Sequence, residues 1–339
     1  KKGNHMTDQR LKLLVEAARA GLSNPEMTTI QNASDLSDFR FEAFHWGFSL
    51  CSQKVRLTLT EKGLPYRSND MSFWDFDNYQ PSYVRLRIYA AGAKRLNQLA
   101  QEHSMRTSVE TEGFDACVVP LLIDHKLEKA VVDSHEIVEY IDRQSGWNKL
   151  IPKDSNLAHA VQKQIKINDQ IPHPGILYGF HANDPRPDFY IPLMDGIYDR
   201  KRIALEELIQ KNKDDPELVR VYESKIKKEM AGKKLQKDSN YMEKILNEFR
   251  TLISGLNDQL ASQQYEFVCG TDFTLADAMW AISLYRIQWL GHAHLWANYP
   301  RVRDYAYRMY QRPAFRKAII EWPYPMPSSP HTTDVEQMV

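Results

Sequence analysis

The chain has 339 residues, and at roughly 150 residues per domain this length predicts about two domains. Hydrophobic residues make up 42% and charged residues 26%, which excludes a chain that is disordered throughout. The 44 Lys and Arg residues balance the 44 Asp and Glu residues, so the basic excess typical of nucleic-acid-binding proteins is absent and we expect no such partner. The longest apolar run, 116–123, is far too short for a membrane span.

The first half of the chain alternates between strand and helix patterns. A polar N-terminal extension over 1–38 contains a helical pattern that Gly21 ends. After it, the spacing of apolar residues predicts strands at 39–43, 65–70, 118–123 and 130–132 and helices at 51–62, 77–86 and 134–144. Residues 87–115 are polar without a sustained period, and we interpret them as an insertion.

Strand patterns stop after residue 154. Helices are predicted at 156–170, 198–211, 216–231, 240–262, 275–290 and 300–311, with a long loop at 171–192. The basic run 225–237 is interpreted as a solvated helix face. The sequence therefore predicts a small α/β domain over 39–146, an all-helical domain over 154–322 and a tail at 323–339.

The three cysteines, Cys51, Cys117 and Cys269, are widely spaced and odd in number. They match neither a disulfide framework nor a CxxC metal site, and together with the lack of a signal-peptide pattern they favour a cytoplasmic protein. Cys117 and Cys269 flank apolar runs and are interpreted as small core residues. His292 and His294 have no further ligand nearby in the sequence, so we expect no metal site.

Ser49, Cys51 and Lys54 surround the start of the helix predicted at 51–62. The N-terminus of a helix carries partial positive charge and free N–H groups, which stabilise a thiolate. Lys54 lies about one turn further on and could add positive potential, while Ser49 could cap the helix or donate to the thiolate. Position alone leaves open whether Cys51 is a reactive thiol or a half-buried helix residue.

Three further features lie inside or at the ends of predicted elements. Pro120 stands within an apolar strand, where we expect a cis Val119–Pro120 bond in preference to an edge strand with a trans proline. Asp133 and Ser134 start a helix and could cap it or, with its free N–H groups, receive a carboxylate. Residues 274–277, Thr-Leu-Ala-Asp, form a capping box that we assign to folding.

Taken together, the Ser-x-Cys helix start, the Val-Pro strand, the Asp-Ser helix start and the run 270–277 resemble the glutathione S-transferase superfamily from about 39 to 322. The resemblance implies an α/β thioredoxin-like domain followed by an all-α helical domain, usually assembled as a homodimer. It also implies glutathione as co-substrate. The Val119 backbone beside Pro120 would hold its cysteinyl part, and Asp133 and Ser134 would hold its γ-glutamyl end.

Within the superfamily, the segments 49–56, 83–87, 112–115 and 283–286 resemble the bacterial reductive dehalogenases of chlorinated hydroquinones. Those enzymes use a cysteine where Cys51 stands. The resemblance implies that glutathione thiolate displaces halide, that Cys51 then takes up the glutathione as a mixed disulfide, and that a second glutathione resolves it. Ser49 would assist the first thiolate, and Lys54 would support anions in the site.

Aromatic residues next to the expected thiol could bind a small aromatic substrate. Trp46 and Phe48 adjoin Ser49 and could form the wall of a flat pocket. Further candidates for the same pocket are Tyr285, Arg286 and Trp289.

The Ser-x-Cys signature is shared with the zeta-class isomerases. In addition, no tyrosine stands at 44–46, where the animal classes carry a catalytic tyrosine. The sequence therefore leaves open three alternatives to the dehalogenase: a zeta-like cis-trans isomerase, a glutathione-dependent β-etherase and a glutathione-binding protein without turnover.

Overall fold

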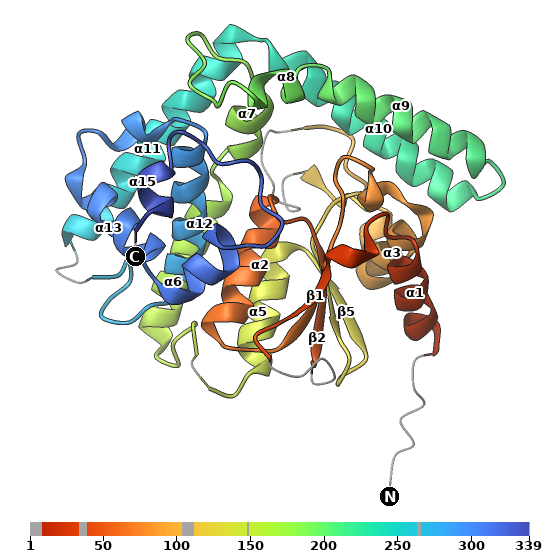
Figure 1. Cartoon of the computed structure of the whole chain (residues 1–339), viewed down its shortest axis with the longest axis horizontal. Coiled ribbons are helices and arrows are strands. Elements are labelled where there is room, and N and C mark those ends of the chain that lie inside the picture. The colour runs from red at the N-terminus through yellow and green to blue at the C-terminus, as the bar shows by residue number, and fades with distance from the viewer. Residues whose placement is uncertain (1–8, 34–38, 104–111, 148, 263–265, 339) are drawn as a thin grey trace, which may run out of the picture.

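The computed structural model describes residues 9–33, 39–103, 112–147, 149–262 and 266–338. Within these residues a five-stranded mixed sheet forms the centre of the N-terminal domain, with strand order β1-β3-β2-β4-β5 (Figure 1). β2 and β3 run parallel, whereas the other neighbouring pairs run antiparallel. The strands are β1 (Thr28–Gln31), β2 (Phe41–His45), β3 (Tyr66–Asp70), β4 (Leu121–Asp124) and β5 (Lys129–Val132).

The sheet separates two layers of helices, because successive residues of a strand point to opposite faces. Leu122 packs into the buried cluster that contains one layer, whereas its neighbour Leu121 packs into the cluster that contains the other. The two layers are α2 (Leu50–Glu61) with α5 (Ser134–Gln144), and α1 (Gln9–Ala20) with α3 (Pro81–Leu96). This arrangement confirms the predicted thioredoxin-like domain.

The second half of the described chain is helical, as predicted. α12 is buried along its whole length and contacts α2, α6 and α13, so that it joins the two domains. The α-helices are α6 (Ser155–Asp169), α7 (His173–Tyr178), α8 (Tyr190–Met194), α9 (Ile197–Lys211), α10 (Pro216–Gln236), α11 (Ser239–Ser262), α12 (Leu275–Trp289), α13 (Pro300–Tyr310), α14 (Pro313–Phe315) and α15 (Thr333–Glu336). Short segments of 3-10 helix are η1 (Pro25–Met27), η2 (Asp77–Tyr79) and η3 (Ala293–Trp296), and η4 (Arg316–Ile320) is a turn of π-helix.

The helices α9 and α10 form a hairpin that extends away from the other helices of the second domain and lies over α3 (Figure 1). Leu205 of α9 and Tyr222 of α10 belong to the same buried cluster as α1 and α3. The hydroxyl of Tyr222 also donates to the backbone oxygen of Tyr79 at 2.6 Å. The hairpin therefore packs on the first domain although it follows the second domain's first helices in the chain.

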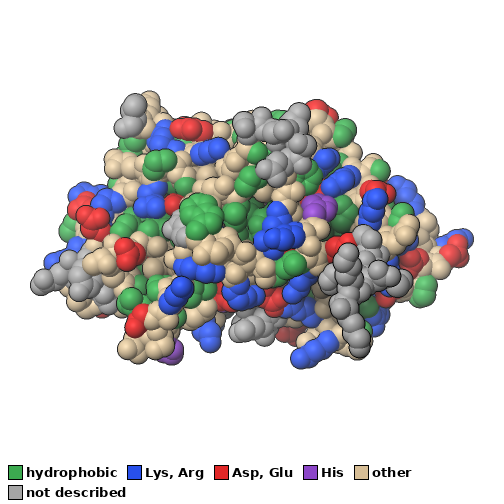
Figure 2. All heavy atoms as spheres, turned by 90° about the horizontal axis from the view of Figure 1, so that it is seen from below, with side chains coloured by type: hydrophobic (Ala, Val, Ile, Leu, Met, Phe, Trp, Pro, Cys, Tyr) green, Lys and Arg blue, Asp and Glu red, His purple; other side chains and the backbone are tan. Residues whose placement is uncertain are grey.

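The surface agrees with the composition. On the face shown in Figure 2, Lys and Arg side chains are interspersed with Asp and Glu side chains, in keeping with their equal numbers in the sequence. None of the helices that the structure describes combines the length and the apolar character needed to cross a bilayer.

Four sequence predictions need correction. The loop predicted at 171–192 contains α7 and α8, and the strand predicted at 118–123 begins only at Leu121, so that Pro120 precedes it. The strand β1 was not predicted, because its four residues are all half-buried and carry no alternating pattern. α3 continues to Leu96 with a break at Gly92 (φ 75°), so residues 87–96 are not part of an aperiodic insertion. The apolar pattern of this helix is interrupted at Arg87, which is buried although it is charged. Its guanidinium donates to the backbone oxygen of Pro120 at 2.7 Å. Residues 104–111 of the predicted insertion lie outside the described residues.

The predicted capping box at the start of α12 is present. The buried carboxylate of Asp277 accepts from the backbone N–H and the hydroxyl of Thr274, both at 2.9 Å. It also accepts from the Val268 backbone N–H at 2.9 Å and from the Tyr305 hydroxyl at 2.8 Å. Four donors on one buried carboxylate fix the start of α12 to the loop before it and to α13.

We predict that Asp277→Ala lowers the free energy of unfolding by about 3 kcal/mol or more, because it leaves buried donors without their acceptor. Asp277→Asn, which keeps the shape and one acceptor oxygen, should lose less. Urea unfolding of both variants measures the difference. A normal unfolding curve together with lost activity would contradict a purely structural role.

Candidate active site

The predicted thiol lies where the first βα connection enters α2. Ser49 is the N-cap of the helix, and its hydroxyl accepts from the backbone N–H of Ser52 at 3.3 Å. Cys51 is the second residue of the helix, half-buried and with a free thiol. Since the N-terminal N–H groups and the helix dipole both favour negative charge, this position suits a thiolate.

The loop before Cys51 is held by buried polar side chains. Asp70 accepts from the Gly47 backbone N–H at 2.8 Å and from the Trp322 indole N–H at 2.7 Å. Arg56, fully buried, donates to the Gly47 backbone oxygen at 2.8 Å, and Arg286 donates to the Phe48 backbone oxygen. Gly47 is required here, since a Cβ would lie 2.8 Å from the Tyr324 backbone oxygen.

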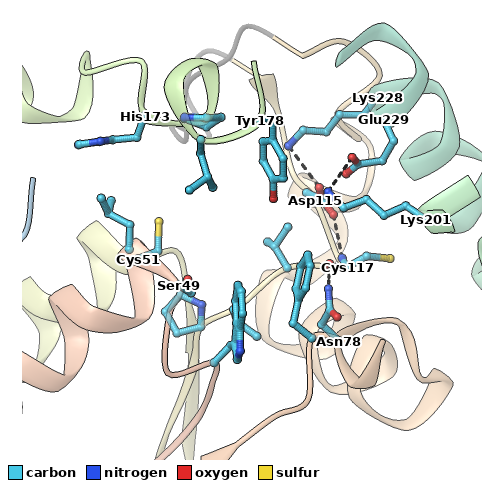
Figure 3. Close-up of a pocket in the computed structure, with 18 of the residues that line it drawn as sticks. Ser49, Cys51, Asn78, Asp115, Cys117, His173, Tyr178, Lys201, Lys228 and Glu229 are labelled. Atoms are coloured by element: carbon cyan, nitrogen blue, oxygen red, sulfur yellow. Dashed lines mark hydrogen bonds and ion pairs between the residues drawn. The ribbon is translucent and has the colours of Figure 1, made fainter. Parts of the chain in front are cut away.

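A cavity opens beside this loop and gathers most of the predicted site residues (Figure 3). From the N-terminal domain it is lined by Trp46, Phe48, Ser49, Leu50, Cys51, Val119, Pro120, Asp133 and Ser134. From the helical domain it is lined by His173, Pro174, Leu177, Tyr178, Tyr190, Met194 and Arg286. The structure thus brings the thiol, the Val119–Pro120 bond just before β4 and the Asp-Ser helix start to one place.

The Val-Pro and Asp-Ser features have the geometry expected of them. The Val119–Pro120 bond is cis, as predicted. Asp133 caps α5 by accepting from the His135 backbone N–H at 3.0 Å, and its φ of 75° is uncommon for a residue other than glycine. Burial raises the pKa of the Asp133 carboxyl, so a cation bound beside it would stabilise its charged form.

Lys54 does not line the cavity. Its buried ammonium lies 3.6 Å from the carboxylate of Asp169 on α6. The other oxygen of Asp169 lies 2.9 Å from His135 Nδ1, and His135 Nε2 lies 2.9 Å from Glu139. Hydrogen bonds to Asp169 and then Glu139 raise the pKa of His135 to about 10. This chain of ion pairs joins α2, α6 and α5, and its His135 follows Asp133 and Ser134 in the sequence.

An aromatic wall, made of Trp46, Phe48, Phe73 and Trp74, bounds the cavity. The rings of Trp46 and Phe73 are stacked, with centroids 4.5 Å apart and an interplanar angle of 14°, and Trp74 meets both edge-on. The sequence predicted the first two residues, whereas Phe73 and Trp74 were missed. A stack of flat rings at a cavity suits a flat aromatic ligand.

The three remaining pocket candidates differ in position. Arg286 lines the cavity, with its guanidinium 3.9 Å from the Phe48 ring centroid, and burial lowers the pKa of Arg286 to about 10. Trp289 lies behind Phe48, with ring centroids 4.8 Å apart, and Tyr285 packs on Tyr310. Both line a separate hollow on the other side of the loop, so the structure does not place them in the cavity.

Sequence reasoning missed the charged residues at the opposite side of the cavity from Cys51, among them Lys228 and Glu229 of α10 (Figure 3). Lys225 of the same helix lies 2.7 Å from Glu229. They were interpreted as a solvated helix face, but Lys225 and Glu229 are buried. The pattern could have indicated this, because both residues continue the helix face that Leu218, Val221 and Tyr222 bury.

The other two thiols differ in position: Cys117 lines the cavity, whereas Cys269 is not among the residues that line it. Cys117 and Cys269 are buried, and burial raises the pKa of Cys269 to about 12, so both stay protonated. Among the residues that the structure describes, no group of three or more His, Cys, Asp or Glu side chains is placed to hold a metal ion.

Comparison with known proteins matches two segments of the chain to one family. Residues 48–144 match "Glutathione S-transferase, N-terminal domain", and residues 218–318 match "Glutathione S-transferase, C-terminal domain". A 2,5-dichlorohydroquinone reductive dechlorinase of Sphingobium indicum is 39% identical over 85% of this chain and 85% of its own length. The Tetrachloro-P-hydroquinone reductive dehalogenase of Sphingobium chlorophenolicum is 24% identical over 81% of this chain and 94% of its own.

Among solved structures, the β-etherase LigF from Sphingobium sp. strain SYK-6 superposes with a TM-score of 0.56. The match covers 84% of this chain and 100% of the etherase, at 17% identity. This likeness concerns the fold alone.

The raised pKa of His135 makes the stability of the protein depend on pH. The ion pairs of His135 stabilise the folded state fully below the unfolded pKa of about 6.5, and this contribution is lost as pH rises through about 10. His135→Gln, which leaves Asp169 beside Lys54, should cost about 1 to 2 kcal/mol at pH 6, a value reduced for the partial exposure of the ring. The cost should shrink toward pH 9.5. Urea unfolding of both proteins at the two pH values measures it, and an equal cost at both would refute the assignment.

Proposed function

This chain belongs to the glutathione S-transferase superfamily, and we propose that it removes halide reductively from a halogenated hydroquinone at the expense of glutathione. The proposal depends on one observation: the free thiol of Cys51 at the N-terminus of α2 lines the same cavity as the aromatic wall. The names of the two Sphingobium relatives support this reaction class.

Glutathione would lie along the N-terminal domain side of the cavity. The backbone of Val119 would pair with its cysteinyl part, because a peptide ligand needs backbone partners of this kind. Asp133 and Ser134 would take its γ-glutamyl end. The α-ammonium of that end would offset the cost of burying the Asp133 carboxylate, and its α-carboxylate would meet the N-terminal N–H groups of α5. A homodimer, usual in the superfamily, is part of the proposal.

The first step is attack of the glutathione thiolate on the halogen-bearing carbon of the ring in its quinone-like tautomer. A carbon–sulfur bond forms, the carbon–halogen bond breaks, and halide leaves with the bonding electrons. The hydroxyl of Ser49 would assist, because it accepts from the Ser52 N–H and can direct its own hydrogen to the thiolate. The aromatic wall would hold the ring flat during the attack.

The second step reduces the ring. The Cys51 thiolate attacks the glutathione sulfur, a disulfide bond forms, and the carbon–sulfur bond breaks with its electron pair going to the ring, which takes up a proton. A second glutathione thiolate then attacks the mixed disulfide, which frees Cys51 and releases oxidised glutathione. Overall, one aryl halide and two glutathione molecules give one dehalogenated ring, one oxidised glutathione, one halide and one proton.

The stoichiometry tests the proposal against its alternatives. With dichlorohydroquinone we expect one chloride and one oxidised glutathione for each two molecules of glutathione consumed, measured by ion chromatography and by mass analysis. An isomerase would consume no glutathione, a β-etherase would release a phenol from an aryl ether without chloride, and a binding protein would turn over nothing. Any of those results would replace the dehalogenase by the corresponding alternative.

Variants at the thiol loop separate the two steps. Cys51→Ser and Cys51→Ala should still release chloride, because the first attack needs only glutathione, but the product should become a glutathionyl hydroquinone. Ser49→Ala should slow chloride release, by about tenfold for one lost hydrogen bond to a charged group, and leave the product unchanged. Mass analysis of the products distinguishes these outcomes. Fully reduced hydroquinone formed by Cys51→Ser at the wild-type rate would show that the cysteine takes no part.

A further inference from the structure

The side of the cavity opposite Cys51 carries an unusual set of buried charges, which we call the charged end (Figure 3). It consists of three ammonium groups and three carboxylates, and each side chain is at most 12% exposed. His103 also lies there, 3.3 Å from one of the carboxylates. The charged residues are Lys201, Lys225, Lys228, Glu112, Asp115 and Glu229.

The charges of the charged end are paired, and the buried guanidinium of Arg87, which also lines the cavity, donates to the backbone oxygen of Asp115 at 3.1 Å. Lys225 Nζ lies 2.7 Å from both Asp115 and Glu229, and Lys228 Nζ lies 3.2 Å from Asp115 and 2.9 Å from Glu112. Although burial alone would raise them, the lysines hold the pKa values of Asp115 and Glu229 well below their usual range. Buried charges are thus kept at a cavity wall, where desolvating them is costly.

Lys201 differs from the other two lysines. Among the described residues its ammonium contacts one carboxylate, Glu229, at 3.0 Å. It otherwise lies over aromatic rings, 4.5 Å from the centroid of Tyr178 and 5.7 Å from that of Phe73, which belongs to the aromatic wall. An ammonium group has three N–H donors, so Lys201 can give a hydrogen bond to a ligand where the aromatic wall meets the charged end.

The buried ammonium and carboxylate groups, which lie side by side, indicate which chemical group fits. A bound carboxylate or phenolate would face three carboxylates already present, and a bound cation would face three ammonium groups. A neutral hydroxyl group both accepts from an ammonium and donates to a carboxylate, so it satisfies both kinds of partner without adding charge. A para-dihydroxylated ring on the aromatic wall would direct one hydroxyl to this end while its opposite edge faces the thiols.

We propose that Lys201 and Glu229 form a subsite that binds a ring hydroxyl of the substrate and restricts this enzyme to hydroxylated aromatic rings. This inference rests on the proposed function, from which it takes the hydroquinone as substrate. It adds that the enzyme orients the ring by one of its hydroxyl groups. Lys201 donates to the hydroxyl oxygen, and Glu229 accepts its hydrogen. A merely structural role, in which the charges only join segment 112–118 to α10, would give no preference for hydroxylated ligands.

The test measures binding without turnover. Hydroquinone and 1,4-dimethoxybenzene are titrated into the full chain, and quenching of tryptophan fluorescence reports binding because Trp46 and Trp74 line the cavity. We expect the wild type to bind hydroquinone roughly tenfold or more tightly than the dimethyl ether, the ratio expected for a hydrogen bond to a charged group. Equal affinities for the two rings would overturn the subsite.

In Lys201→Met the affinities for hydroquinone and for the dimethyl ether should differ by no more than about threefold. The affinity for the ether itself should stay within about twofold of the wild-type value. The variant keeps Glu229 beside Lys225. Lys233→Met is the matched control, because its exposed ion pair with Asp199 joins the same two helices, and it should keep the wild-type ratio. A wild-type ratio in Lys201→Met would overturn the proposal.

A near-isosteric second variant, Glu229→Gln, keeps the test decisive if Lys201→Met does not fold, as judged by its melting curve. It should also lower the ratio, and a wild-type ratio in it would count against the subsite. Failure of the proposed function would appear separately, as wild-type protein that prefers hydroquinone over the ether but releases no chloride from dichlorohydroquinone.

Discussion

The thiol of Cys51 keeps its place because the backbone of the loop before α2 is paired with buried side chains from both domains. Carbonyl and N–H groups that lose contact with water need hydrogen-bond partners. Asp70 accepts from the backbone N–H of Gly47, and Arg56 donates to its backbone oxygen. Arg286 of α12 donates to the backbone oxygen of Phe48. These residues also tie the loop to the C-terminal segment, through Trp322 and the backbone oxygen of Ala318. The position of the nucleophile is therefore a property of the whole fold.

The parts of the site that were predictable are those with a local cause. Helix starts and a capping box each depend on a few neighbouring residues, and so Ser49, Cys51, Asp133 and Ser134 could be placed at helix starts without a structure. That they meet at one cavity was expected from the family resemblance and not from these local patterns. The same reasoning gave the correct bounds of α5, whose buried residues recur at helical spacing.

The parts that failed depend on contacts between distant segments. Lys54 is one turn after the thiol in sequence, but its stem leads toward Asp169 of α6, a partner that no local pattern reveals. Lys225 and Glu229 were taken as surface residues because buried charges are rare. The ion pair between Lys225 of α10 and Asp115 of the other domain offsets the free-energy cost of burying these charges. Charged residues that continue an apolar helix face are the signal to look for.

The α9–α10 hairpin has a mechanical consequence. Leu205, Val221 and Tyr222 share one hydrophobic cluster with α1 and α3, so the two domains are joined by a common core as well as by α12. A hinge motion that separated them would expose this cluster to water, at a cost on the order of 2 kcal/mol for each large side chain. Rigid-body opening is thereby opposed, and without it the lining of the cavity still reaches the surface at Trp74, which is 43% exposed.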